Sequence, residues 1–301
     1  MTTGFLLIDK PTGSTAHDVV ARIRRSVGAK VGHAGTLDPM ATGLLVLGLG
    51  GATRLLRFVQ IADKEYVATA LFGVATDSLD ADGAILSREP LPVTSAEVEA
   101  AMERFRGNIM QIPPMVSARR VGGRRLYELA REGKIVEREA RSVTIRQLEL
   151  VDLAPSNYPE VTFRTVCTTG TYIRTLADDL AQALGGHAHL TALRRMRIGS
   201  LDISQAVTVE EAVRIIEASE LDHILVSPSD ALSDIPKITV DDTMAAAVRH
   251  GRDLPDLLVP DLFAEGSGEG ASPVRITDRE GKLIAIYRHD RSTLRPQVVL
   301  S

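Results

Sequence analysis

The most constraining feature of the chain is a glycine-framed segment, Gly32–Gly43, that carries a single carboxylate, Asp38. An apolar run, Leu44–Leu47, follows it directly and predicts a buried strand. Glycine adopts backbone conformations that other residues avoid, and Pro39 fixes its own φ and restricts the residue before it. Asp38 is therefore expected on a stiff loop, a common place for an ionisable group that performs chemistry. The alternative is an Asx turn, in which the Asp38 side chain bonds to its own backbone.

Short apolar segments alternate with helical patterns along the chain, which predicts an α+β fold. The expected strands are Gly4–Ile8, Leu44–Leu49, Tyr66–Phe72, Val143–Leu150 and Val161–Cys167. The expected helices are Ala16–Val27, Ser95–Phe105, Leu126–Glu132 and Ile173–Leu184. Ser95 suits the start of its helix, and Gly185-Gly186 suits the end of the last one. Asp178 and Asp179 are expected on the exposed face of that last helix.

The pattern changes near residue 230, where Pro228 and Pro236 bracket a plausible linker. Beyond it, a helix is expected over Asp241–Gly251, and strands over Val274–Thr277, Leu283–Arg288 and Gln297–Leu300. The sequence thus predicts two domains, residues 1–230 and residues 235–301, of which the second is small and rich in strands.

Composition sets wider limits on the class of protein. A chain of 301 residues can bury a sizeable core, and the mean hydropathy of +0.04 is typical of a soluble globular protein. No apolar run approaches the roughly 20 residues that a membrane helix needs, and the first residues lack the basic start of a signal peptide. The single cysteine, Cys167, excludes an internal disulfide and a multi-cysteine zinc site. These features predict a cytoplasmic protein.

The net charge of −4 is unevenly distributed. Residues 202–271 carry 15 acidic and 4 basic side chains, whereas residues 119–146 carry nine Arg or Lys against four Glu. Arg194, Arg195 and Arg197 add a second basic group without an acid nearby in sequence. Clustered arginines suit phosphate binding, because the guanidinium engages two oxygens at once; a solvated basic helix is the alternative.

Two apparent motifs carry little weight. Gly48-Leu49-Gly50-Gly51 follows a strand but lacks the full spacing of a dinucleotide-binding loop. His187 and His189 could suggest a metal, but no set of acidic or cysteine ligands accompanies them, so they are expected in a loop. The sequence therefore favours neither a dinucleotide nor a metal.

Several further motifs occur in a fixed order over residues 5–200. They are Asp9–Gly13, the segment Gly32–Gly43 itself, Lys64–Tyr66, Thr76–Gly83, Gln111–Pro114, Arg125–Arg131, Gly170–Leu176 and Leu193–Arg195. This ordered set closely resembles the B-type tRNA pseudouridine synthases, the enzymes that isomerise the T-loop uridine of tRNA (position 55) to pseudouridine.

The resemblance implies a pseudouridine synthase catalytic fold with a large mixed, mainly antiparallel sheet. It implies an RNA-binding thumb insertion at about residues 111–135 and, less strongly, a small C-terminal β-barrel of the PUA type over residues 235–301. The implied substrate is the T-arm stem-loop of tRNA, with the target base flipped out of its stack. It implies no cofactor and no metal. No membrane contact is expected, nor an obligatory protein partner, and the protein is expected to be a monomer.

The resemblance also implies that Asp38 is essential, either as a nucleophile at C1′ or as a base at C2′. Tyr66 would stack on the flipped base and assist proton transfer at C5; an ordinary core aromatic is the alternative. Arg174 would pair with Asp38 and keep it ionised by lowering its pKa, with a structural arginine at a helix start as the alternative.

Eight residues match positions implied to bind the substrate. They are His33, Lys64, Arg119, Arg120, Tyr172, Leu193, Arg194 and Arg195. His33 would occupy space vacated by flipped nucleotides. Tyr172 and Leu193 would line the base pocket, although plain core packing explains them nearly as well. Val116 and Arg120 depart from the family, which often has Tyr and Lys there.

Three classes of function compete: a stand-alone tRNA pseudouridine synthase, a guide-RNA-dependent subunit that works with partner proteins, and a noncatalytic RNA chaperone. The compact length and the arginine-rich insertion favour stand-alone action. The joint presence of Asp38, Tyr66 and Arg174 favours an enzyme over a chaperone.

Overall fold

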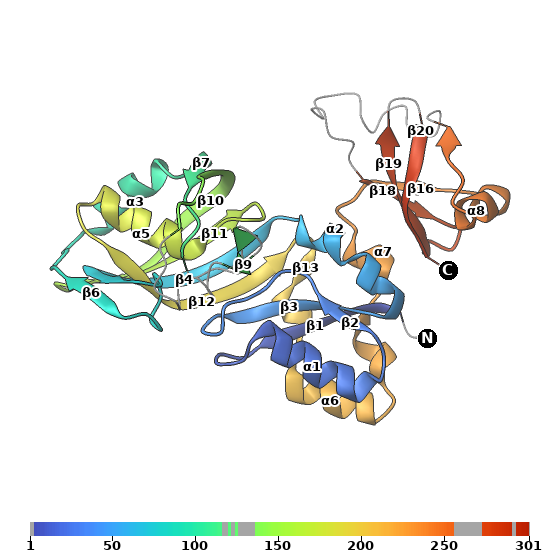
Figure 1. Ribbon diagram of the computed structural model, residues 1–301, viewed down its shortest axis with the longest axis horizontal. Coiled ribbons are helices and arrows are strands. Elements are labelled where there is room, and N and C mark those ends of the chain that lie inside the picture. The colour runs from blue at the N-terminus through green and yellow to red at the C-terminus, as the bar shows by residue number, and fades with distance from the viewer. Residues whose placement is uncertain are drawn as a thin grey trace.

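A large mixed sheet organises the first three quarters of the chain (Figure 1). The computed structural model describes residues 3–115, 120–121, 124–125, 136–255, 273–290 and 293–300, with the backbone alone at 120, 121, 124 and 125. The sheet has eleven strands, eight of them in the order β14 (Val207–Thr208), β1 (Gly4–Lys10), β3 (Thr42–Leu49), β12 (Ala188–Ile198), β4 (Lys64–Phe72), β11 (Glu160–Cys167), β10 (Arg141–Ala154) and β7 (Gly107–Gln111). Three short strands extend it: β2 (Val31–His33), β13 (Leu201–Asp202) and β15 (Leu225–Val226).

The sheet is mainly antiparallel, as the family resemblance implied. Among its described pairs, β1–β14 and β3–β12 are parallel and the others antiparallel. Two small hairpins lie outside it: β5 (Val74–Thr76) with β6 (Ile85–Arg88), and β8 (Arg120–Val121) with β9 (Arg124–Arg125).

Both faces of the β1–β3 pair are buried. Leu6 and Ile8 pack in one cluster with α1 (Ala16–Val27) and α6 (Val209–Glu217), which lie side by side (Figure 1). Phe5 and Leu7 alternate with them and belong to a second cluster on the opposite face. A strand covered on both faces needs an uninterrupted apolar run, which is what β1 and β3 supply. Local signals set the ends of α1, since Thr15 and Asp18 form its capping box.

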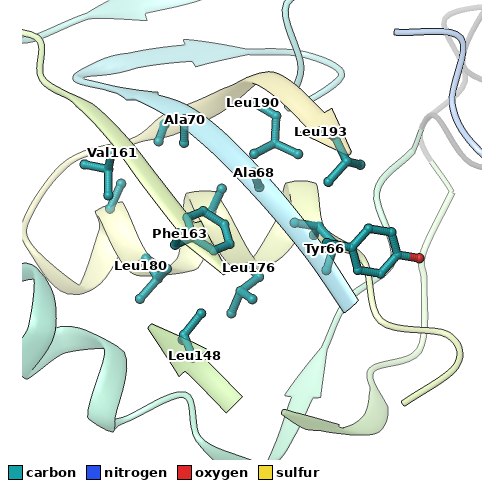
Figure 2. Packing of buried hydrophobic residues seen from close by; sticks show 14 of the residues in the cluster. Tyr66, Ala68, Ala70, Leu148, Val161, Phe163, Leu176, Leu180, Leu190 and Leu193 are labelled. Atoms are coloured by element: carbon teal, nitrogen blue, oxygen red, sulfur yellow. The ribbon is translucent and has the colours of Figure 1, made fainter. Parts of the chain in front are cut away.

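The other half of the sheet carries α3 (Ser95–Glu103) and α5 (Ile173–Ala183) on one face. Figure 2 shows Phe163, Ala68 and Leu190 from three strands packed with Leu176 and Leu180 of α5. Tyr66 lies at the edge of this cluster, and its hydroxyl points away from the apolar side chains (Figure 2).

The C-terminal part is a curled five-stranded sheet (Figure 1). Its strand order is β16 (Lys237–Thr239), β18 (Pro273–Thr277), β19 (Leu283–Asp290), β20 (Thr293–Val299) and β17 (Leu254–Pro255), and α8 (Asp242–Arg249) packs beside it. A short helix, α7 (Pro228–Ala231), capped by Ser227, occupies part of the expected linker. The predicted α+β class, with a second small β unit, is confirmed.

The structure corrects several local expectations. α3 begins at Ser95, as expected, but its N-cap is the preceding Thr94, which forms a capping box with Glu97. His189 lies buried in β12 and contacts the Val74 carbonyl, so it is not in a loop. Asp178 is buried and not on the exposed face of α5, and its carboxylate accepts the Ala188 N–H. The expected helix Leu126–Glu132 lies outside the described residues.

Candidate active site

Asp38 lies on the loop between β2 and β3, at the junction of the two halves of the sheet. The loop is fastened to the segment after β1, because the Pro39 carbonyl accepts the Gly13 N–H at 2.9 Å and contacts Lys10 Nζ at 3.3 Å. The Asp38 carboxylate pairs with a guanidinium from α5: Oδ2 lies 3.1 Å from Arg174 Nε. The stiff loop of the sequence analysis therefore presents Asp38 to a distant helix.

Arg174 joins Asp38 to a second carboxylate. Its Nη1 lies 3.0 Å from Asp80 Oδ2 and donates to the Ser78 carbonyl at 2.9 Å. Asp80 is held by the Ser78 hydroxyl and the Asp82 N–H. Arg174 and Asp80 keep only 5% and 7% of their side-chain surface exposed, whereas Asp38 keeps 36%. The guanidinium is thus fixed from behind, and Asp38 is the member of the network that a ligand can reach.

Burial controls the acidity of Asp38. It raises the pKa of the Asp38 carboxyl above its ordinary value, because the charged form loses solvation. Arg174 opposes this shift, in the direction expected from the sequence, while Asp80 adds to it. Desolvation is the largest of these effects, so the pKa of Asp38 ends up raised rather than lowered.

A pocket of about 380 Å³ opens beside Asp38. Its apolar surface includes Leu37, Tyr66 and Leu193, and the segment 168–173 forms one wall. The volume falls in the range of small-molecule sites and suits one extruded base with its sugar. Ligand pockets of this kind combine apolar walls with a few placed polar groups, and here Asp38 and Arg174 are among those groups.

Two buried cations, Lys64 and Arg195, help to line the pocket. Lys64 Nζ donates to the carbonyls of Gln60 and Ala62, and desolvation lowers the pKa of Lys64 to about 8. Arg195 is 1% exposed and donates to the Leu44 and Gly35 carbonyls. Burial raises the pKa of Tyr66, and the charge of Arg195 opposes that shift. The phenol therefore stays protonated near neutral pH.

The structure gathers most of the residues predicted from the sequence. Asp38, Lys64, Tyr66, Tyr172, Arg174, Leu193 and Arg195 all line the pocket. Arg194 lies on β12 and points to Asp9, whose carboxylate it engages through both terminal nitrogens at 3.0 and 2.8 Å. Arg119 lies outside the described residues, and only the backbone of Arg120 is described.

His33 ends β2 and lies outside the pocket lining. Its ring meets that of His17 edge to face, with centroids 5.6 Å apart. Burial lowers the pKa of His33, so the imidazole is neutral near pH 7.

Sequence reasoning missed Asp80 and Gln111 as parts of the site. Asp80 belongs to the motif Thr76–Gly83, but no local pattern shows which of its aspartates is buried against Arg174. Gln111 ends β7, is 2% exposed, and bonds to the backbone of Tyr172. Both residues belong to the ordered motifs, but those motifs do not indicate what either residue does.

The described residues offer neither a metal site nor a membrane-spanning helix. No cluster of three or more His, Cys, Asp or Glu side chains there could hold a metal ion. No described helix is long and apolar enough to cross a membrane.

Solved structures share this fold over nearly the whole chain. A chain of a Cbf5–Nop10–Gar1 complex matches with a TM-score of 0.76 and 26% identity, covering 99% of this chain and 84% of that one. A chain of an H/ACA RNP bound to a substrate RNA containing 2′-deoxyuridine has the same fold, with a TM-score of 0.74 and 24% identity, covering 99% and 85%. The fold is that of the pseudouridine synthases.

The sequence comparisons narrow this class to one family. The model of the TruB family pseudouridylate synthase N-terminal domain matches residues 23–173, and that of the tRNA pseudouridylate synthase B C-terminal domain matches residues 174–233. A tRNA pseudouridine synthase B of Burkholderia mallei is 42% identical over 98% of this chain and 95% of its own length. That of Symbiobacterium thermophilum is 46% identical over 82% of each. The chain therefore belongs to the TruB family, and it is an enzyme that isomerises uridine to pseudouridine in tRNA.

Proposed function

We propose that the protein converts the T-loop uridine of tRNA, position 55, to pseudouridine, with Asp38 as the essential catalytic group and no cofactor. The observation that carries this proposal is the partly exposed Asp38 carboxylate, held by the buried Arg174 at the mouth of a base-sized pocket. The substrate and product are isomers, so the net reaction consumes no oxidant, reductant or water.

Two routes use the same carboxylate. In one, an Asp38 oxygen bonds to C1′ while the N1–C1′ bond breaks and its electron pair stays on the uracil. The base turns, C5 bonds to C1′, and the carboxylate leaves. In the other, Asp38 takes the proton from C2′ as N1 departs, leaving a C1′=C2′ double bond. C5 then adds at C1′, and C2′ recovers its proton from Asp38. Both routes end with proton loss at C5 and protonation at N1.

Arg174 and Tyr66 have separate tasks in this proposal. The guanidinium favours the charged form of Asp38 against the cost of its burial and fixes the direction of the carboxylate. Tyr66 contributes an aromatic face to the pocket, and its hydroxyl, which points out of the core, can relay the C5 proton. Leu193 and Tyr172 complete the walls against which the detached uracil turns.

The target base must leave the T-loop stack to enter the pocket, since a stacked base hides its glycosidic bond. The T-arm stem-loop is thus the part of tRNA that the site recognises. We assign the chemistry to residues 1–230, with the thumb at about 111–135, and an accessory PUA-like RNA-binding role to residues 235–301. His33 and Arg194, which lie outside the pocket lining, are the proposed contacts to displaced nucleotides and phosphates.

The runner-up function is that of a guide-RNA-dependent subunit, because the structural neighbour Cbf5 stands in a complex with Nop10 and Gar1. The tRNA pseudouridine synthase B of Burkholderia mallei is more similar in sequence, at 42% against 26%. This favours a monomer that acts in the cytoplasm without a protein partner. Pseudouridine formation by the purified chain on an unmodified tRNA transcript tests the choice; activity only after a guide RNA is added would reverse it.

The assignment of Asp38 is tested by Asp38→Asn, which keeps the shape of the side chain and removes its charge. We expect tRNA binding within about threefold of wild type and no measurable turnover, because neither route proceeds with an amide. Asp152→Asn, an exposed aspartate on β10, is the matched control and keeps wild-type turnover. Appreciable turnover by Asp38→Asn would show that another group does the chemistry.

A further inference from the structure

We propose that Gln111 is a positioning residue for the reaction: its buried amide fixes the first turn of α5 and so holds the Arg174 guanidinium against Asp38. The inference rests on the proposed roles of Arg174 and Asp38. Gln111 is the last residue of β7 and does not line the pocket.

The contact between Gln111 and α5 is reciprocal. Gln111 Nε2 donates to the Tyr172 carbonyl at 3.2 Å, and the Tyr172 N–H donates to Gln111 Oε1 at 3.0 Å. The side-chain amide therefore meets both backbone groups of one residue, as a neighbouring strand would. Gln111 is 2% exposed, so the contact is shielded from water and is made at nearly full strength.

The first turn of α5 depends on outside support. Tyr172 is its N-cap residue, and an aromatic side chain makes no capping bond. The Tyr172 carbonyl accepts the Leu176 N–H that closes the first turn, so whatever fixes the Tyr172 peptide fixes the start of the helix. Gln111 supplies that support from another part of the sheet, in place of a local cap.

Arg174 follows Tyr172 by two residues and lies in this first turn. Its guanidinium reaches Asp38 at 3.1 Å and Asp80 at 3.0 Å, so a displacement of the turn changes both distances. The pocket-wall segment that precedes α5 is bonded to β10 in the same reciprocal way. The Thr168 hydroxyl accepts the Thr144 N–H, and the Thr168 N–H donates to the Thr144 carbonyl. Gln111 and Thr144 belong to paired strands, β7 and β10, so this strand pair supports the pocket wall.

The test uses Gln111→Met, which keeps the length of the side chain and removes both hydrogen bonds. A misplacement of about 1 Å can cost on the order of 10²-fold in rate, so we expect the single-turnover rate to fall by about tenfold to 10²-fold. The Kd for tRNA should stay within about threefold of wild type, since Gln111 is buried and does not line the pocket. The rate should fall at low pH as Asp38 becomes protonated, and this fall is the acidic limb of the pH profile. In Gln111→Met the acidic limb should move to higher pH, because a displaced Arg174 stabilises the charged form of Asp38 less.

A double-mutant cycle separates positioning from general weakening of the fold. If Gln111 acts through Arg174, then Gln111→Met adds almost nothing to the loss already caused by Arg174→Lys. Asn108→Ala removes another side-chain contact between the same two strands, Asn108 to Thr144 at 2.7 Å, and should leave the rate and the acidic limb unchanged. Gln111→Asn keeps the amide but is one methylene shorter, so it cannot make both bonds to Tyr172, and should show the same effects if Gln111→Met fails to fold.

Three results would overturn the inference: a wild-type rate in Gln111→Met, a slower rate with an unmoved acidic limb, or losses that multiply in the double variant. They are distinct from a failure of the proposed function itself. In that case Arg174→Lys alone would react at the wild-type rate, whatever the Gln111 variants do.

Discussion

The single guanidinium of Arg174 forms ion pairs with two carboxylates. Asp38 and Asp80 both approach its guanidinium, and the network is nearly closed to solvent except at Asp38. Asp80 orients the guanidinium, but its negative charge also adds to the raised pKa of Asp38. The site therefore combines geometric control of Asp38 with an electrostatic cost, a combination that is common where buried groups do chemistry.

This balance predicts a pH dependence. The proposed reaction uses the Asp38 carboxylate, so the rate falls as the pH drops through the pKa of Asp38. Because burial raises that pKa, the acidic limb of the wild-type single-turnover rate should lie above the ordinary value of an aspartate. Arg174→Gln removes the strongest influence that lowers the pKa, so the limb should move to still higher pH. Arg174→Lys keeps the positive charge, so the acidic limb should move less than in Arg174→Gln. Its rate should still fall, because lysine lacks the planar guanidinium that orients Asp38.

The measurement is a set of single-turnover rates between pH 5 and 9, corrected for tRNA binding at each pH. An acidic limb of Arg174→Gln at or below that of wild type would contradict the electrostatic role of Arg174.

At the scale of elements, the pairing of β3 with β12 brings the Asp38 loop to the pocket. The two strands run parallel, with Gly43 opposite Arg195. Gly43 has φ +98°, and a Cβ there would lie 2.3 Å from the Arg195 carbonyl oxygen. Only glycine suits both this φ and this spacing. Gly43 thus sets how closely the strand that follows Asp38 approaches the strand that carries Leu193.

Gly43→Ala should therefore be costly. The left-handed φ and the backbone clash together should lower the free energy of unfolding by at least about 2 kcal/mol, and the displaced β3 should slow catalysis. Gly28→Ala is the matched control: Gly28 also has a positive φ, +65°, but its Cβ would meet nothing within 4 Å. It should cost only about 1 kcal/mol and leave the rate unchanged. Urea unfolding of both variants checks this, and equal losses would show that the β3–β12 approach is not the cause.

At the scale of the whole molecule, the C-terminal sheet packs firmly against the first part of the chain. Leu283, Ile286 and Val298 share a hydrophobic cluster with Phe5 and Leu7 of β1. Polar contacts extend this interface, because Arg54 donates to the Val299 carbonyl and Arg57 to that of Gln297. The buried guanidinium of Arg275 holds the connecting segment through the carbonyls of Ser229, Ser233 and Ile235. The proposed accessory domain is thus attached as a fixed body and not by a free tether.

The proposed division of labour predicts the behaviour of a chain that ends at Ser233. Its pocket is complete, since all the lining residues precede that point. It should fold with a lower Tm than the full chain, because the cluster around Phe5 and Leu7 loses partners. It should still form pseudouridine in an isolated T-arm hairpin and bind whole tRNA more weakly.

Comparison of the truncated and full chains on the hairpin and on whole tRNA checks this prediction. If the truncated chain folds and binds the hairpin without forming pseudouridine, then the C-terminal sheet contributes to catalysis and the assignment is wrong.

The sequence by itself determined the features that depend on neighbouring residues. The apolar runs of β1, β3, β4 and β11 and the ends of α1 were predictable, because strand propensity, capping and glycine conformation are local. The loop position of Asp38 followed in the same way from the residues around it. Family motifs in fixed order added the class of reaction and most of the residues that line the pocket.

Only the tertiary structure decided which charges are buried and what they contact. β12 escaped prediction because two register shifts, at Leu190/Ala192 and Arg195/Arg197, interrupt the alternation of its apolar side chains. The sequence predicts Arg195 as a phosphate ligand, whereas the structure makes it a buried donor to backbone carbonyls. Asp80, to which the sequence assigned no role, is the second partner of Arg174. A charge can be buried only where distant segments bring it a partner. That pairing is set by how the strands and α5 meet, which no local pattern encodes.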